Sequence, residues 1–165
     1  MVAINRILVA TDFSEASSAA LLYGMNLART YRAQLDVVHV VNDLAARMLP
    51  SYETIPDVGR VQTEMEAVAR HALDALLAGE DRRLLRARAV LLTSAQTGDR
   101  IVSYARDARA DLIVMGTHGR TTVANFFMGS TAQHVVRSAP CPVLTVRHSQ
   151  LNTMQTDELQ RLVAS

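Results

Sequence analysis

Two glycine-containing segments in the last third of the chain have the residue types that bind phosphate. Gly116 and Gly119 follow a short apolar run, and Gly129, Ser130 and Thr131 follow after nine further residues, 120–128. Glycine lets the backbone approach a ligand closely. The residues that open a helix present unpaired N–H groups at the positive end of its dipole. We therefore expect an anion to bind between Gly116 and Thr131.

The basic residues limit how such an anion can be held. All 17 are arginine, and the spacing of the glycines matches neither the dinucleotide-binding fingerprint nor the Walker A motif. A Walker A lysine, a Schiff base and a lysine general base are therefore excluded. A phosphate has to be held by backbone amides, hydroxyl groups, arginine or a metal ion. Arg120 follows Gly119 directly, and its side chain has two possible destinations, a phosphate or solvent.

The composition is that of one globular domain with no special affinity for polyanions or lipid. The 165 residues are 49% hydrophobic and 20% charged, and the net charge is +1. We expect neither nucleic acid nor a membrane as a partner. The first residues lack the apolar run of a secretory signal, and the single cysteine, Cys141, does not indicate an oxidising compartment. The expected location is the cytoplasm.

Short apolar runs alternate with helical periods along the chain. Near-continuous apolar runs are typical of parallel strands that are covered on both faces. Strand and helix in alternation predict right-handed crossovers. The sequence therefore predicts an α/β fold, a single doubly wound open parallel five-stranded sheet with helices on both faces. The predicted strands are Ile7–Ala10, Leu35–Val41, Ala89–Leu92, Leu112–Met115 and Val143–Val146.

Several local features can be predicted between these strands. Val61, Met65 and Val68 belong to an apolar stripe that should form the packed face of a helix over 58–76. Asp99 and Ser130 are the expected caps of the two helices that follow. The segment 42–56 is the longest expected loop and could cover a ligand. The tail, 148–165, loses the pattern, and a short helix and a frayed end are both open.

Two stretches resemble one known family. Asp111–Arg147, DLIVMGTHGRTTVANFFMGSTAQHVVRSAPCPVLTVR, resembles the C-terminal half of universal stress proteins, whose nucleotide-binding subgroup has this glycine spacing followed by serine or threonine. Arg6–Leu21, RILVATDFSEASSAAL, resembles the first strand and turn of the same family. Together with the strand at Val37–Val41, the similarity extends to Arg147. The Gly-x-Pro turn of many relatives is absent, because Ala95–Asp99 occupies its place.

The resemblance implies a fold, a ligand and an assembly. The family domain would occupy 1–147 with the sheet order 3-2-1-4-5, and two copies would pair through the strand Pro142–Arg147. The ligand would be ATP or another adenine nucleotide, with Mg²⁺ bridging Asp12 and the phosphates. Val40 would offer its backbone to adenine, and the ribose would lie beside Met115. With Thr11 and Arg120 added as neighbouring candidates, the full set of candidate contacts is Thr11, Asp12, Val40, Met115, Gly116, Gly119, Arg120, Gly129, Ser130 and Thr131.

The functional hypothesis is an ATP-binding regulator of the stress response that acts on an unidentified protein partner. The alternative is a dimeric interaction module without nucleotide. A third class, ATP pyrophosphatases and adenylating ligases, is disfavoured because the turn Thr11–Ser14 lacks the glycines of their phosphate loop. The sequence shows no activated nucleophile, so we expect slow ATP hydrolysis at most.

Some candidate residues also have a purely structural explanation. Asp12 and Glu15 have the spacing of a capping box for the first helix. His39 lies in an apolar strand and is expected to be a hydrogen-bonded structural residue. His118 is expected to be a solvated loop residue, and Cys141, between two prolines, is expected to be buried and unreactive.

Overall fold

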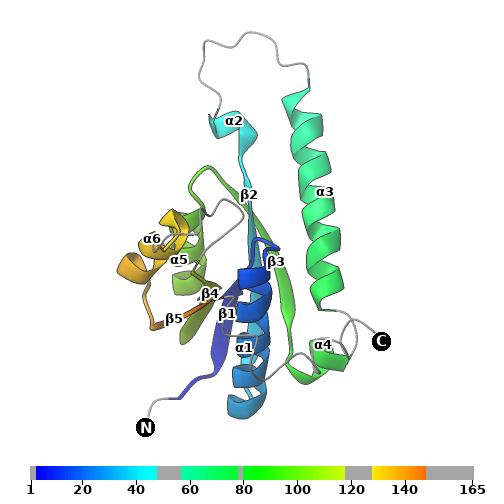
Figure 1. Ribbon diagram of the computed structural model, residues 1–165. Helices are drawn as coiled ribbons and strands as arrows, with labels where there is room; N and C mark the ends of the chain where they lie inside the picture. Colours follow the sequence, from blue (N-terminus) through cyan, green and yellow to red (C-terminus); the bar gives the residue numbers. More distant parts are fainter. Residues whose placement is uncertain (1–2, 48–56, 78–79, 118–127, 148–165) are drawn as a thin grey trace.

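The protein folds as a parallel sheet with helices on both faces (Figure 1). The computed structural model describes residues 3–47, 57–77, 80–117 and 128–147. The strands are β1 (Arg6–Ala10), β2 (Gln34–Asn42), β3 (Arg88–Ser94), β4 (Leu112–Gly116) and β5 (Val143–Val146). They are all parallel and lie in the order β3-β2-β1-β4-β5, which confirms the predicted sheet.

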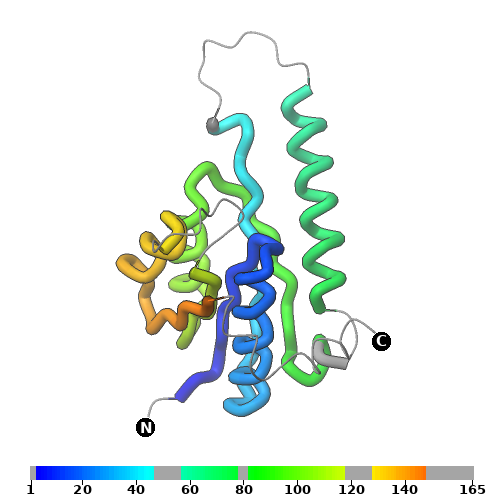
Figure 2. The backbone as a smooth tube through the Cα atoms, viewed as in Figure 1, coloured from blue at the N-terminus to red at the C-terminus, as the bar shows by residue number. Residues whose placement is uncertain are grey.

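Six helices are present in the described part of the chain: α1 (Glu15–Tyr31), α2 (Leu44–Arg47), α3 (Val58–Leu76), α4 (Glu80–Leu84), α5 (Thr97–Asp107) and α6 (Ser130–Ser138). The tube in Figure 2 shows α1 in front of the sheet, α3 along its β3 side, and α5 and α6 together. The predicted tail, 148–165, and most of the predicted loop, 48–56, lie outside the described residues.

Alternate residues of the central strand enter two separate cores. Ile7 and Val9 pack with α1, whereas Leu8 and Ala10 pack with α5 and α6. Ile7, Leu8 and Val9 are fully buried. A strand that is covered on both faces needs apolar side chains at every position, which is why β1 is a continuous apolar run.

A glycine in the middle of α1 brings this helix close to the sheet. A Cβ atom built on Gly24 would overlap Cγ2 of Val9, and it would also touch Leu35. Val9 is fully buried and β-branched, so its side chain has little freedom to move away. Gly24 is therefore required by packing, although glycine is a poor helix former.

The predicted packed face of α3 is wrong. The helix buries Ala69 and Leu73, whereas Val61, Met65 and Val68 are 41%, 36% and 71% exposed. Figure 1 shows that the N-terminal half of α3 extends past the strand ends, which accounts for the exposure of Val61 and Met65. Val68 lies in the C-terminal half, but on a different face of the helix from the buried Ala69 and Leu73. Its periodicity identifies a helix but cannot tell how much of it the sheet covers.

Three turns that lead from a helix into a strand have an arginine in the left-handed conformation. Arg32, Arg86 and Arg109 have φ values of 54°, 47° and 54°. Each arginine N–H donates to the carbonyl three residues earlier, and the N–H of the following alanine donates to the carbonyl five residues earlier. This is the Schellman pattern of helix ends. A left-handed residue other than glycine costs about 1 kcal/mol, so glycine would be less strained here.

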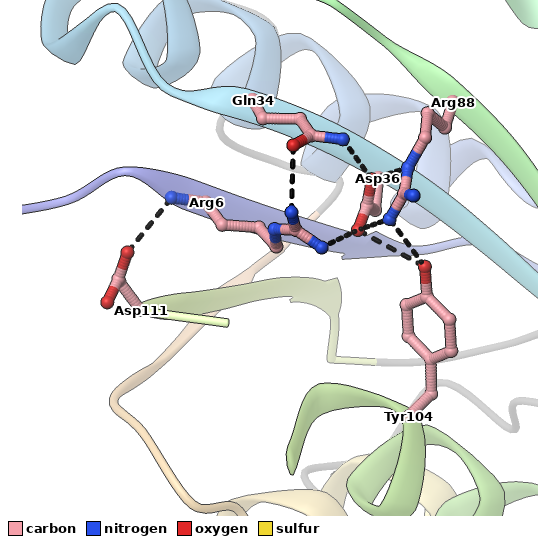
Figure 3. Close-up of polar contacts among 6 residues, drawn as sticks. All are labelled: Arg6, Gln34, Asp36, Arg88, Tyr104 and Asp111. Atoms are coloured by element: carbon pink, nitrogen blue, oxygen red, sulfur yellow. Dashed lines mark hydrogen bonds and ion pairs between the residues drawn. The ribbon is translucent and has the colours of Figure 1, made fainter. Parts of the chain in front are cut away.

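A buried carboxylate connects the first three strands (Figure 3). Asp36 on β2 is fully buried, and it accepts two hydrogen bonds from Arg88 on β3, both of 2.8 Å. Tyr104 on α5 donates to the same carboxylate at 3.2 Å, and Arg6 on β1 lies 3.6 Å from it. The carboxylate raises the pKa of the Arg88 guanidinium, and burial raises the pKa of Tyr104. The buried charge is thus paired, as folding requires.

The close packing of α1 leads to a first testable prediction. We expect Gly24→Ala to lower the free energy of unfolding by about 1–3 kcal/mol, because overpacking against Val9 outweighs the better helix propensity of alanine. Urea denaturation followed by circular dichroism measures the change.

Gly59→Ala is the matched control, because Gly59 also lies in a helix and a Cβ atom there would meet no atom of the described residues within 4 Å. This variant should be as stable as the parent or more stable. Equal stability of Gly24→Ala and Gly59→Ala would contradict the close approach of α1 to β1.

Candidate functional site

A pocket of about 280 Å³ opens at the carboxyl ends of β1 and β4. The chain leaves these neighbouring strands toward opposite edges of the sheet, because β2 lies on one side of the pair and β5 on the other. Ligands of open α/β sheets bind at such a switch point. The pocket is lined by Ala10, Thr11, Asp12, Ser17, Thr97, Ile101, Met115, Gly116, Thr117, Gly129, Ser130, Thr131 and Ala132.

The first turn of α6 supplies the amides of this pocket. The Gly129 N–H donates to the Thr117 carbonyl at 2.8 Å, and the Gly129 carbonyl accepts the first helical hydrogen bond from Gln133. The amides of Ser130 and Thr131 come next. Neither has a hydrogen-bond partner among the residues that the structure describes. They are the orphan donors of a helix start, which favours an anion.

The predicted cap of α6 is wrong by one residue. Gly129, with φ −57° and ψ 150°, is the N-cap, and Ser130 is the first helical residue. Within the described part of the chain, no side-chain hydrogen bond caps this helix. Glycine has no side-chain oxygen that could accept a hydrogen bond from the first amides of the helix. Ser130 is the first helical residue and not the cap, so its hydroxyl group does not take the N-cap role.

The turn between β1 and α1 is held by hydrogen bonds of its own. Ser14 is the N-cap of α1 and accepts from the Ser17 amide. Asp12 Oδ1 accepts from both the N–H and the hydroxyl of Ser14, at 3.1 and 2.6 Å. The predicted alternative, in which Asp12 itself caps α1, is therefore wrong, because Asp12 supports the cap instead. Its carboxylate also lines the pocket.

His39 supports the same turn from β2. Its Nδ1 lies 2.8 Å from the Thr11 carbonyl, and its ring centroid lies 4.5 Å from that of Phe13. Phe13 has a φ of 63°, so the turn contains a left-handed residue. The structural role predicted for His39 is confirmed. The Thr11 hydroxyl accepts from the Phe13 amide at 3.1 Å, which fixes Thr11 at the pocket wall.

The end of β4 approaches α1 too closely for a side chain. A Cβ atom on Gly116 would lie 3.0 Å from both the carbonyl carbon and the Cβ of Ala16. Met115, directly before it, is 5% exposed and packs with α5 and α6. Gly116 thus has a packing reason to be glycine, besides its place in the pocket wall.

The structure adds wall residues that the sequence reasoning did not include. Thr97 and Ile101 reach the pocket from α5, Ser17 from α1, and Thr117 from the residue after β4. The only signal for Thr97 was its position in the turn Ala95–Asp99, where the chain departs from the family pattern. Its role could not be deduced from that departure.

Helices α5 and α6 are joined beside the pocket. The predicted cap of α5, Asp99, lies inside the first turn, and the N-cap is Gln96 without a side-chain hydrogen bond. Asp99 Oδ1 instead lies 2.7 Å from Nε2 of His134 on α6. The cap prediction failed because a partner on another helix holds the Asp99 carboxylate.

Three of the predicted contacts are not among the described residues of the pocket wall. Val40 is 8% exposed and belongs to the core below α5, so contact through its backbone stays a prediction. Gly119 and Arg120 lie outside the described residues, as does His118. The predicted residues that the structure brings together are Thr11, Asp12, Met115, Gly116, Gly129, Ser130 and Thr131.

The oxygen atoms of the pocket suit a hard cation only in combination with a ligand. The Asp12 carboxylate and the hydroxyl groups of Thr11, Ser130 and Thr131 are the kinds of donor that Mg²⁺ accepts. Within the described ranges, no group of three or more His, Cys, Asp or Glu side chains could hold a metal ion. A magnesium ion at Asp12 would therefore be held mainly by phosphate and water.

Two further expectations concern exposure. Cys141 is partly buried, and burial raises the pKa of its thiol, with Asp111 adding to the effect. A raised pKa lowers the thiolate fraction and agrees with the predicted low reactivity.

In the described parts of the chain, no helix combines the length and the apolar character that crossing a bilayer requires.

The sequence comparison decides the family. The model of the universal stress protein family matches residues 3–147. The chain belongs to this family. A universal stress protein from Thermus aquaticus is 34% identical over 151 residues, which are 86% of this chain and 97% of the relative.

Solved universal stress proteins have the same fold. UspA from Lactobacillus plantarum is 30% identical, with a TM-score of 0.69, over 87% of this chain and 98% of that one. A family member from Burkholderia pseudomallei is also 30% identical, with a TM-score of 0.68, over 88% of this chain and 98% of that one.

Two more distant universal stress proteins were solved with nucleotides. One, in complex with cAMP, is 23% identical with a TM-score of 0.55, and covers 88% of this chain and 98% of its own. The other, from Archaeoglobus fulgidus, is in complex with dAMP; it is 21% identical with a TM-score of 0.55, over 88% of this chain and 99% of its own. Some proteins of this fold thus bind adenine nucleotides.

Asp12 holds the turn before α1, and two substitutions test whether its oxygen atom or its charge is responsible. Asp12→Ala should lower the free energy of unfolding by about 1 kcal/mol, because both hydrogen bonds to Ser14 are lost. Asp12→Asn keeps an oxygen that can accept from Ser14, so its stability should stay close to that of the parent. Thermal and urea unfolding measure both variants. A loss of equal size in Asp12→Asn would show that the negative charge itself holds the turn.

Proposed function

We propose that this universal stress protein binds ATP or another adenine nucleotide in the pocket at β1 and β4, and that binding regulates its interaction with a protein partner in the stress response. The observation that carries the proposal is the start of α6, where the amides of Ser130 and Thr131 have no partner among the described residues and line the pocket. Amides at a helix start are suited to a phosphate.

The nucleotide would span the pocket from the sheet to α6. In this pose the ribose lies beside Met115 and Gly116, with Gly119 adjacent, and the adenine lies toward the backbone of Val40. The phosphates lie on the first turn of α6, where Arg120 would add a positive charge. Mg²⁺ would bridge them to Asp12.

The nucleotide complexes of the two distant family members support the choice of ligand class. Both cAMP and dAMP are adenine nucleotides, and both proteins have the fold of this chain. The polar atoms of the pocket are amides and hydroxyl groups rather than a nucleophile next to a base. Binding with slow hydrolysis at most is therefore the proposed activity.

Proline at position 130 tests the contribution of a single amide. Proline is well tolerated as the first helical residue, and Gly129 already has the extended conformation that a residue before proline prefers. Ser130→Pro should therefore fold but lose the amide donor. We expect its affinity for Mg-ATP in isothermal titration calorimetry to fall about tenfold or more, the worth of a hydrogen bond to a charged group.

Ser130→Ala is the control, because it removes the hydroxyl group and keeps the amide. It should bind ATP much better than Ser130→Pro. If the parent protein shows neither heat of binding nor a rise in melting temperature with ATP, the nucleotide proposal fails. Equal affinity in the parent and in Ser130→Pro would place the phosphates elsewhere.

Assembly as a cytoplasmic homodimer is the second part of the proposal, and it also fits the alternative, an interaction module without nucleotide. β5 is an edge strand of the sheet, and Leu144 on it is 36% exposed. An exposed apolar edge favours pairing with another strand, here the segment Pro142–Arg147 of a second copy.

A charge on this edge tests the dimer. Leu144→Glu should shift the protein toward monomer in sedimentation velocity, because two like charges would meet across the two-fold axis. Tyr31→Glu is a control on the exposed side of α1, where the side chain is 49% exposed. A dimer of unchanged strength in Leu144→Glu would contradict pairing through β5.

A further inference from the structure

A second pocket, of about 490 Å³, lies at the amino ends of the strands, on the opposite side from the first pocket. Four arginines line it: Arg6 at the start of β1, and Arg32, Arg86 and Arg109 in the turns that precede β2, β3 and β4. Asp111 is the carboxylate of the described lining. The pocket therefore has a marked excess of positive charge, although the net charge of the chain is only +1.

The acidic side chain at this pocket is already engaged. Asp111 Oδ2 accepts from the backbone amides of Asn5 and Arg6, at 2.7 and 2.9 Å. Figure 3 shows Asp111 bound to the Arg6 amide, away from the arginine head groups that gather around Asp36. Asp36 is itself fully buried and paired with Arg88.

Among the described residues, three of the four guanidinium groups have no hydrogen-bond or ion-pair partner. Arg6 donates to Gln34 at 2.9 Å and lies 3.6 Å from Asp36. For the side chains of Arg32, Arg86 and Arg109, the described residues provide neither a hydrogen bond nor an ion pair, and all three are exposed. All three residues line the same pocket.

The backbone gives an independent reason to assign a role to these arginines. Arg32, Arg86 and Arg109 all adopt the left-handed conformation at the end of a helix. Glycine is the residue that fits this position without strain. Three strained turns that each have an arginine in the lining of the same pocket are better explained by a role of the arginines than by the turns themselves.

We propose that this pocket binds a small molecule that carries two or more phosphate groups, at a site separate from the nucleotide pocket. Guanidinium groups bind phosphate through paired N–H donors, and several around one cavity suit a ligand with several phosphates. The pocket is concave and within the size range of small-ligand sites. A small ligand is favoured over nucleic acid, because an extended polyanion would need a basic surface and the net charge is low.

Tripolyphosphate is the probe, measured by isothermal titration calorimetry in the Ser130→Pro protein, so that the start of α6 contributes less. The test variant is Arg32→Gly/Arg109→Gly in the same protein. Glycine suits both left-handed positions, so this variant should keep its fold, which circular dichroism and urea unfolding verify. We expect its affinity for tripolyphosphate to fall about tenfold or more, because charge-assisted hydrogen bonds are lost.

Arg70→Ala/Arg137→Ala is the matched control. Both arginines are exposed, on α3 and α6, and both double variants change the net charge from +1 to −1. This control, also made in the Ser130→Pro protein, should bind tripolyphosphate as tightly as the Ser130→Pro protein itself at 150 mM salt. Remote surface charges are largely screened at this concentration.

Four results would overturn the proposal. Equal loss in both double variants would show an effect of net charge, and unchanged binding in Arg32→Gly/Arg109→Gly would exclude the pocket. Absence of tripolyphosphate binding in the Ser130→Pro protein would also exclude it, whatever the fate of the nucleotide site. If oligothymidylate binds more tightly than tripolyphosphate and depends on Arg32 and Arg109, the ligand is nucleic acid and the small-molecule assignment is wrong.

Discussion

The candidate nucleotide site depends on one hydrogen bond, from the Gly129 amide to the Thr117 carbonyl. Thr117 is the residue that follows β4, and its own amide donates to Val146 on β5 at 2.9 Å. This pair of bonds fixes the start of α6 to the sheet at the point where the strand order reverses. The next amides, of Ser130 and Thr131, lie at the pocket and have no hydrogen-bond partner among the residues that the structure describes.

The carboxyl ends and the amino ends of the strands present two different kinds of anion site. At the carboxyl ends of the strands, the described donors are backbone amides and hydroxyl groups. At the amino ends they come from arginine side chains on Schellman turns, such as Arg32 and Arg109. All 17 Lys and Arg residues of this chain are arginine. Without lysine, backbone amides and arginine side chains are its main donors to a phosphate, besides hydroxyl groups and metal ions. We expect the two sites to bind independently.

The sheet could be predicted from the sequence because burial on both faces leaves a continuous apolar run, as in β1. Gly116 and Ser130 could be predicted as wall residues because they lie at a strand end and a helix start on one side of the sheet, and Asp12 was implied by the family resemblance. The helix caps could not be predicted, because Ser14 and Gly129 take the N-cap positions through contacts that form only in the folded chain. The packed face of α3 and the wall residue Thr97 depend on how far each helix extends over the sheet, which periodicity does not encode.

The most direct test of the central claim is a ¹H–¹⁵N correlation spectrum of the protein titrated with Mg-ATP. The amides of Ser130, Thr131 and Ala132 should shift most, together with Gly116 and Thr117, because these residues line the pocket. The amides of the turns at Arg32 and Arg109 should shift much less. Saturable shifts elsewhere, with the amides at the start of α6 unchanged, would contradict a phosphate at this helix.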